Sequence, residues 1–327
     1  MKKVFRFSLI VVCLTLISGC SKKSRISGMN VNFSSSAGKI SVVCNTFPFY
    51  DWTREVLGDE KSFELKLIQK NGSDLHNFKA SVQDLIDIRQ SDLFIYGGGE
   101  SDEWITESLF SDKTRVIKLI DIDFPYVMEE DEDEKDEHIW LSLKNAKIFI
   151  KVIAFALSEA CPKGALDFEK NASAYIEKLK ALDENFSTLF EESFAGGKVD
   201  FIICDRFPFA YFERDYGLSC FAAFNGCSAE SEASFEKVAF LAEKLNRSKA
   251  NFVFTLENSE KKLAQTVIFN SEKKDARIYE LDSMQGVKIS GEPEKLKNGG
   301  ETDGEISYLS IMEKNYQTVK TALNAIK

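Results

Sequence analysis

Hydrophobic and polar positions form two strand-and-helix series along the chain, separated by one long amphipathic stretch. In the first series, short runs of apolar and β-branched residues alternate with segments of helical periodicity. The predicted strands are residues 39–44, 63–68, 92–96 and 115–120, and the predicted helices are residues 49–57, 81–90, 102–110 and 142–160. This alternation is typical of a mainly parallel sheet with helices on both faces, so we predict an α/β lobe.

The amphipathic stretch 166–194 carries large apolar side chains at helical spacing. Its apolar positions are Phe168, Tyr175, Leu179, Leu182, Phe186, Leu189 and Phe190. A helix of this length far exceeds the usual mean of about three turns. We therefore expect a stiff connector between two lobes; the alternative is an ordinary surface helix of the second lobe.

Beyond residue 197 the strand-and-helix rhythm starts again. Strands are predicted at 199–204, 219–224, 251–256 and 276–281, and helices at 208–215, 234–245, 260–270 and 308–326. The predicted fold class is α/β, with two lobes of mainly parallel sheet joined by one long rigid helix. The expected boundaries are 39–164 for the N-terminal lobe, 165–196 for the connecting helix and 197–327 for the C-terminal lobe, without a convincing sequence repeat.

The amino-terminal region has the pattern of a secretory signal. Lys2, Lys3 and Arg6 precede an apolar run at 7–17, which is too short to span a membrane, and small residues then lead to Cys20. Residues 1–19 are therefore predicted to be a signal peptide. The tetrapeptide ISGC resembles a bacterial lipobox, which implies a lipidated Cys20 rather than a coincidental cysteine. With 20–38 as a flexible tether, we expect an extracytoplasmic protein anchored to a bacterial membrane.

The charge balance of the chain narrows the classes of partner. The 327 residues include 52 acidic and 42 basic side chains, which argues against a nucleic-acid partner. Residues 129–137 alone hold eight carboxylates and one lysine. The simplest interpretation is a solvated loop. Because this loop precedes His138, it could also raise the local concentration of cations.

The number and spacing of the cysteines bear on whether the protein contains disulfide bonds. Seven cysteines are present, and five remain after signal cleavage and lipidation: Cys44, Cys161, Cys204, Cys220 and Cys227. An odd number outside the cytoplasm leaves at least one free thiol in a monomer. Cys220 and Cys227 are the nearest pair and could form a disulfide. The chain has no CxxC, so a structural zinc knuckle is not indicated.

The chain has two histidines, His76 in NGSDLHNF and His138 in DEHIWLSL. Asp74 and Glu137 precede them closely. Imidazole is the commonest protein ligand of transition metals, and a nearby carboxylate can orient the ring. His76 also follows a predicted strand, where open α/β sheets bind ligands. Our hypothesis is that both rings bind one metal ion; the alternative is a helix cap at His138 and a surface turn at His76.

Several segments together resemble the solute-binding lipoprotein of a zinc or manganese ABC importer. They are VVCNTFPFYDWTREVLGD, NGSDLHNF, DLFIYGGGESDEW, DEHIWLSLKNA, FAYFERDYGL and CSAESEASF, in the order found in that family. The similarity covers roughly residues 39–327. It implies two α/β lobes joined by a long helix, with the metal site in the cleft between the lobes.

Carried onto this sequence, the resemblance assigns His76 as the first metal ligand, in a DxH segment, and His138 as the second, in an H-x-W segment. The fourth position is usually a carboxylate in a Leu-Asp turn, and it falls on Asp282 in ELDSM, directly after the predicted strand 276–281. The third position, usually His or Glu, falls on Arg206. This departs from the family pattern, because a guanidinium has no lone pair to give.

Several compensations for Arg206 are open. Asp205 or Cys204 could supply the missing atom, a water could do so, or Glu257 could reach the ion from the turn after residues 251–256. Alternatively, Arg206 pairs with Asp282 and the site is weakened. Two imidazoles with one or two carboxylates favour zinc, with manganese second, while cobalt and nickel stay open.

These features predict a monomeric protein that captures a divalent metal ion and delivers it to an ABC permease with its ATPase. Release should follow imidazole protonation below about pH 6. An enzyme is not expected, because the chain has neither HExxH nor G-x-S-x-G. The alternatives are a lipid-anchored metalloenzyme and a surface adhesin or small-solute binder with a degenerate metal site.

Overall fold

The computed structural model of the chain describes residues 38–128, 135–226, 233–289 and 306–326. The predicted signal peptide 1–19, Cys20, nearly all of the tether and most of the acidic loop 129–137 lie outside the described residues. Among the residues described, no helix is both long and apolar enough to cross a membrane.

The first lobe contains a parallel sheet with the strand order β2-β1-β3-β4. Its strands are β1 (Ile40–Cys44), β2 (Phe63–Leu67), β3 (Leu93–Tyr96) and β4 (Arg115–Lys118), and its α-helices are α1 (Phe47–Leu57), α2 (Val82–Gln90) and α3 (Leu143–Ala160). All four strands run in one direction. Their carboxyl ends therefore meet at one edge, and the loops that follow them can converge there.

The second sheet repeats this arrangement with the order β6-β5-β7-β8, again all parallel. Its strands are β5 (Asp200–Phe207), β6 (Ser219–Asn225), β7 (Phe252–Leu256) and β8 (Arg277–Leu281), and the accompanying helices are α5 (Ala210–Tyr216), α6 (Phe235–Arg247), α7 (Lys262–Asn270) and α8 (Tyr308–Asn324). Numbered from its own first strand, each sheet has the order 2-1-3-4. The lobes thus share a topology that their sequences do not reveal.

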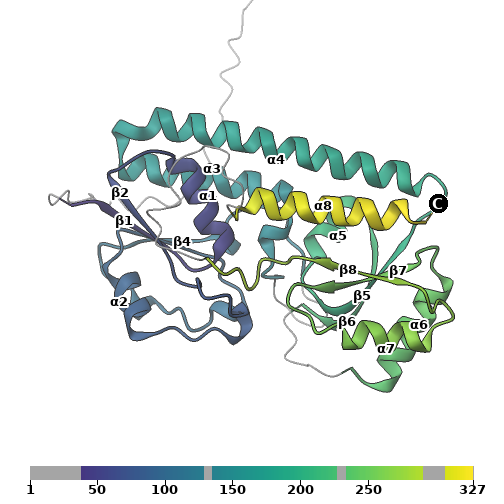
Figure 1. Cartoon of the computed structure of the whole chain (residues 1–327). Coiled ribbons are helices and arrows are strands. Elements are labelled where there is room, and N and C mark those ends of the chain that lie inside the picture. The colour runs from purple at the N-terminus through teal and green to yellow at the C-terminus, as the bar shows by residue number, and fades with distance from the viewer. Residues whose placement is uncertain (1–37, 129–134, 227–232, 290–305, 327) are drawn as a thin grey trace, which may run out of the picture. The chain divides into compact units, whose positions relative to one another are not determined.

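The long helix α4 (Ala165–Phe194) lies between the two series in the chain. Its predicted apolar stripe is buried, from Phe168 to Phe190. Helix α4 contacts α1 and α3 of the first lobe and α5 and α8 of the second part of the chain (Figure 1). The predicted fold class is therefore confirmed, with two α/β lobes and one long helix linking them. The exact lobe boundaries stay a prediction.

Two local predictions differ from the structure. Residues 102–110 form two short 3₁₀ turns, Glu100–Asp102 and Glu107–Leu109, rather than the predicted helix. The buried Asp102 carboxylate accepts hydrogen bonds from the Gly98 amide and the Asn45 side chain, and this holds the chain in a compact turn. Helix α1 begins at Phe47, before the predicted start, because proline is favoured in the first turn of a helix.

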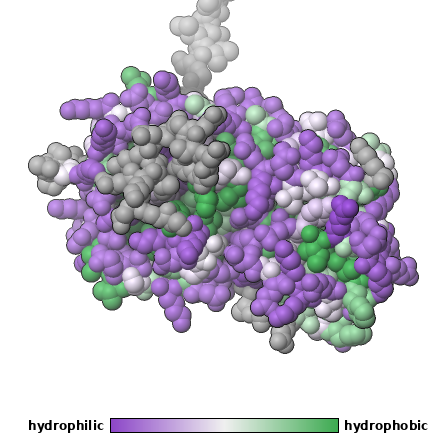
Figure 2. All heavy atoms as spheres, in the orientation of Figure 1, coloured by the Kyte–Doolittle hydropathy of each residue, from purple (hydrophilic) through white to green (hydrophobic). Residues whose placement is uncertain are grey.

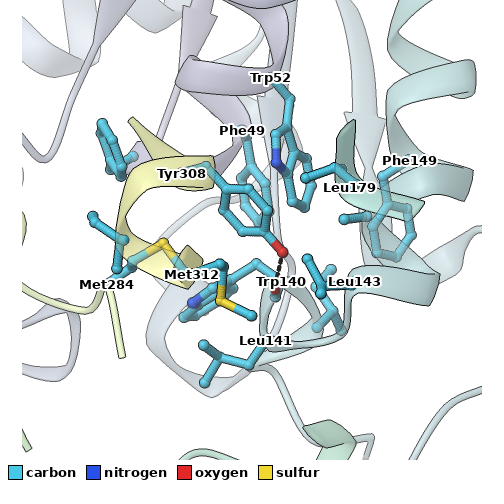
Figure 3. Packing of buried hydrophobic residues seen from close by; sticks show 14 of the residues in the cluster. Phe49, Trp52, Trp140, Leu141, Leu143, Phe149, Leu179, Met284, Tyr308 and Met312 are labelled. Carbon is cyan, nitrogen blue, oxygen red and sulfur yellow. Dashed lines mark hydrogen bonds between the residues drawn. The ribbon is translucent and has the colours of Figure 1, made fainter. Parts of the chain in front are cut away.

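A buried aromatic cluster joins α8 to the first lobe (Figure 3). Tyr308, at the start of α8, packs edge-on against Trp52 with ring centroids 5.1 Å apart. Its hydroxyl donates to the Trp140 carbonyl over 2.7 Å, and the Trp140 indole donates to the Ser283 carbonyl over 2.9 Å. Burying large aromatic side chains with paired polar tips is strongly stabilising. The cluster therefore fixes Trp140, two residues beyond His138.

The cysteines among the described residues are free thiols. Cys220 is a free thiol in the structure, and Cys227, its possible disulfide partner, lies outside the described residues. Cys44, Cys161 and Cys204 are also free. Hydrophilic residues predominate on the face shown in Figure 2, in keeping with the charged composition.

Candidate metal centre

The loop after β2 carries His76 in a short 3₁₀ turn, Leu75–Asn77. Asp74 caps this turn, and its Oδ1 accepts a hydrogen bond from the His76 amide over 3.0 Å. The Leu75 amide donates to the Gln285 carbonyl over 3.1 Å. The His76 backbone is therefore held from within its own turn and from the segment that follows β8.

His138 is fully buried at the start of the 3₁₀ turn Ile139–Leu141. Its side chain makes no capping hydrogen bond, so the alternative of a simple helix cap is not supported. Asp136 accepts the His138 amide at Oδ1 over 2.7 Å. Trp140 anchors the other side of the turn in the aromatic cluster, so His138 is fixed on both sides.

The fold brings the two imidazoles together although 61 residues separate them in the sequence. Their ring centroids lie 5.7 Å apart with an interplanar angle of 59°. His76, Glu137 and His138 offer ligand atoms within 4.8 Å of one another. Ligand atoms this close together could hold one metal ion.

Hydrogen bonds define which nitrogen of His76 is free to bind a metal. The Ser101 hydroxyl donates its single proton to Glu137 Oε1 over 2.6 Å, and it lies 2.8 Å from His76 Nδ1. The ring must then donate to Ser101, which places the proton on Nδ1. The lone pair is left on His76 Nε2.

A neighbouring acceptor also fixes the tautomer of His138. Its Nδ1 lies 3.1 Å from Asp136 Oδ1, an acceptor that also takes the His138 amide. Carboxylate–imidazole contacts of this kind orient metal-binding histidines and leave the second nitrogen for the metal. The lone pair of His138 is therefore on Nε2 as well.

Both Nε2 atoms face the side chain of Gln285, a residue that the sequence did not single out. Its amide nitrogen lies 2.6 Å from His138 Nε2 and 3.4 Å from His76 Nε2. An amide NH₂ has two protons, and a half-turn about the last side-chain bond exchanges its nitrogen for an oxygen acceptor. Gln285 is therefore placed to offer an oxygen to an ion bound by both rings. No sequence signal points to it, because a glutamine three residues after Asp282 is unremarkable.

Glu137 lies on the opposite side of His76 from Gln285. It accepts the Ser101 amide at Oε2 over 2.8 Å as well as the Ser101 hydroxyl at Oε1. Gly99 makes room for it, since a Cβ added at that position would lie 2.1 Å from the Glu137 Cβ. Glu137 and Ser101 therefore orient the ring of His76 from its Nδ1 side, opposite Nε2.

The carboxylate predicted as the fourth ligand is not among the ligand atoms grouped around the two rings. Asp282 Oδ1 accepts the Met284 amide over 2.9 Å. Its neighbour Glu257 accepts the Ser283 amide and hydroxyl, and burial together with the Asp282 charge raises the pKa of Glu257 to about 7. These carboxylates stabilise the turn after β8.

The candidates at the end of β5 are also engaged elsewhere. Asp205 accepts the Arg206 amide over 2.9 Å. Cys204 is buried in an apolar cluster, and burial raises the pKa of its thiol, which disfavours the thiolate that binds metals. Among the described residues, neither belongs to the group of ligand atoms around the rings.

Arg206 pairs with Asp74, so the expected alternative pairing with Asp282 is wrong. The guanidinium thus contacts the turn that carries His76. Asp74 is already the cap of that turn, and the arginine adds a charge-assisted hydrogen bond to its partly buried carboxylate.

The surroundings of His76 also change the expected pH range of metal release. Burial, followed by the charges of His138 and Arg206, lowers the pKa of His76 to about 4, and the charges of Glu137 and Asp74 oppose the change. If His76 binds a metal, protons would compete for this ring only near pH 4, which is more acidic than the release expected below about pH 6.

An NMR titration of the two histidine resonances in chelator-treated protein tests this lowered pKa, with His138→Gln to assign the signals. We expect His76 to titrate near pH 4. Because the unfolded chain protonates near pH 6.5, it binds more protons between these values, so His76 makes the fold less stable as the pH falls through that window. A midpoint near 6.5 would contradict the burial and hydrogen bonding described above.

Known proteins match this chain in sequence and in fold. Zinc-binding lipoprotein AdcA of Streptococcus pneumoniae serotype 4 is 28% identical over 335 residues, which cover 98% of this chain and 61% of AdcA. The metal ABC transporter substrate-binding lipoprotein SsaB of Streptococcus sanguinis is 28% identical over 281 residues, covering 82% of this chain and 86% of SsaB. This chain thus spans about three fifths of the length of the AdcA relative.

A solved structure gives the same result. The zinc-bound ZnuA-like domain of Streptococcus pneumoniae AdcA superposes with a TM-score of 0.66 and 28% identity, covering 88% of this chain and 100% of that domain. The family model described as zinc-uptake complex component A, periplasmic, matches residues 42–322. The chain therefore belongs to the ZnuA family of zinc-uptake components, as its resemblance had implied.

Proposed function

We propose that this protein captures a divalent metal ion outside the cytoplasm and delivers it to an ABC-type permease and its ATPase. The observation that carries the proposal is the convergence of His76 Nε2 and His138 Nε2 on Gln285, with both Nδ1 atoms held by oxygen acceptors. The relatives AdcA and SsaB bear names that refer to zinc binding and to metal transport.

We assign His76 and His138 as the metal ligands, and Gln285 Oε1 as the oxygen that completes the protein's part of the coordination. Water takes the remaining position. Asp282 stays a weaker candidate, with Asp205 and Glu257 behind it, because each would have to give up hydrogen bonds to backbone amides or to a serine hydroxyl. The assigned ligands are therefore two imidazole nitrogens, one amide oxygen and water, without a carboxylate.

The ligand chemistry favours zinc. Zinc accepts imidazole nitrogens in a four-coordinate shell, whereas manganese prefers more oxygen ligands and a higher coordination number. Zinc also binds such sites more tightly than manganese in the general affinity order. We therefore place zinc first and manganese second.

The remaining assignments follow from the sequence. A signal peptide at 1–19 and lipidation at Cys20 would anchor a monomer to the outer face of a bacterial membrane. No catalytic role is assigned, because binding and delivery require no covalent chemistry. A metalloenzyme would need a general base beside a metal-bound water, and Glu137 is instead committed to Ser101. An adhesin remains a second candidate only if metal binding fails.

Elemental analysis of chelator-stripped and reloaded protein tests the proposal, with isothermal titration for zinc and manganese. We expect one zinc per chain and weaker binding of manganese. Retention of no divalent cation by the wild-type chain would contradict the proposal.

A further inference from the structure

Arg206 occupies the position where the family usually places a third metal ligand, yet its guanidinium forms an ion pair with Asp74. It lies near the carboxyl end of β5, where the pairing with β6 shifts register between Ile203 and Arg206. Such irregularities redirect side chains at the edge of a functional site. The pair connects the second lobe to the loop of His76.

The two oxygens of the Asp74 carboxylate contact different partners. Oδ2 contacts Arg206, and Oδ1 accepts the His76 amide over 3.0 Å. The Asp74 carboxylate therefore links the Arg206 guanidinium to the backbone amide of His76, a proposed metal ligand.

Other contacts between the His76 loop and the second part of the chain come from the segment after β8. The Leu75 amide donates to the Gln285 carbonyl, and the Ile289 amide donates to the Lys70 carbonyl. Arg206 instead projects from β5, which is hydrogen-bonded to a strand on each side. It thus ties the His76 loop to the sheet itself.

We propose that Arg206 is a positioning residue for metal binding, which holds the His76 loop against the second lobe through Asp74. The inference rests on the proposed function. The pair is electrically neutral, so Arg206 anchors the loop without adding net positive charge beside the ion. Its side chain is 19% exposed and that of Asp74 is 27% exposed, so water screens the pair only in part.

Zinc release from Arg206→Gln separates positioning from electrostatics, because the two predict opposite changes. Without Arg206, the unpaired Asp74 would attract the cation more strongly, and electrostatics alone would slow release. Loosening of His76 would accelerate it. We expect stopped-flow release to a chelator to be about tenfold faster, the scale on which groups supporting a metal ligand act. Release at the wild-type rate or slower would overturn the inference.

Two further variants complete the test. The neutral double variant Asp74→Asn with Arg206→Gln keeps the net charge and the side-chain oxygen that accepts the His76 amide, and it should also release zinc about tenfold faster with little change in association rate. Arg206→Lys retains the charge and should restore most of the slow release. A double variant that releases zinc as slowly as wild type would contradict the role of the pair.

The ion pair between Lys147 and Asp183 provides a matched control. Its atoms are 2.8 Å apart, its side chains are 22% and 12% exposed, and it joins α3 to α4. Lys147→Gln with Asp183→Asn should leave zinc release unchanged, and equal acceleration in this control would overturn the inference. If the wild-type chain binds no zinc, the proposed function fails instead.

Discussion

Replacing His138 with alanine should weaken zinc binding by at least about 100-fold, and replacing His76 should have a similar effect. Each change removes one of two imidazole nitrogens, and the remaining neutral oxygen donors cannot compensate for the loss of a nitrogen ligand. Isothermal titration with a competing chelator measures the change. Binding within a few-fold of wild type in either variant would contradict the assignment.

Two controls separate ligand loss from damage to the fold. Zinc should raise the melting temperature of the wild-type protein by mass action but not that of the histidine variants, while the chelated proteins show whether each variant folds. Asp282→Asn should keep near-normal zinc binding, since the Asp282 carboxylate faces the Met284 amide. A severe loss in that variant would place Asp282 on the metal after all.

Gln285→Glu should tighten zinc binding by about tenfold or more above neutral pH. The new carboxylate would lie beside both ring Nε2 atoms, because the present amide nitrogen is 2.6 Å from that of His138 and 3.4 Å from that of His76. It would add a negative charge next to the cation. Burial and the facing lone pairs favour the protonated acid, so the gain should shrink as the pH falls. Titrations at several pH values measure both effects.

The exposed Gln265 on α7 provides the matched substitution for this test. Gln265→Glu adds the same charge away from the rings and should leave zinc affinity unchanged. If Gln285→Glu binds zinc no better than wild type at high pH, Gln285 does not contact the ion. The rings themselves would remain assigned.

Much of the architecture could be predicted because it is encoded locally. The helical stripe from Phe168 to Phe190 and the short apolar strands need only near neighbours in the sequence to be recognised. The helix expected at 102–110 failed because Asp102 hydrogen-bonds to Gly98 and Asn45, and the Asn45 contact joins residues far apart in the chain. The pairing of Arg206 with Asp74 joins residues 132 positions apart, and local pattern carries no information about it.

The two histidines of the candidate site could be predicted from the sequence, but Gln285 could not. His76 and His138 are conspicuous as the two histidines of the chain. Asp282 drew attention as a carboxylate in a suggestive turn, whereas the structure places Gln285 from the same turn against both rings. Which side chain of this turn faces the rings depends on the course of the backbone after β8. That course is fixed in part by the hydrogen bond from the Leu75 amide to the Gln285 carbonyl, which joins residues far apart in the sequence.

X-ray absorption at the zinc edge of the reloaded wild-type protein tests most directly whether both histidines bind one ion. We predict a shell with two imidazole nitrogens at about 2.0–2.1 Å, completed by oxygen. A shell with one imidazole or none, or one that contains sulfur, would contradict the account.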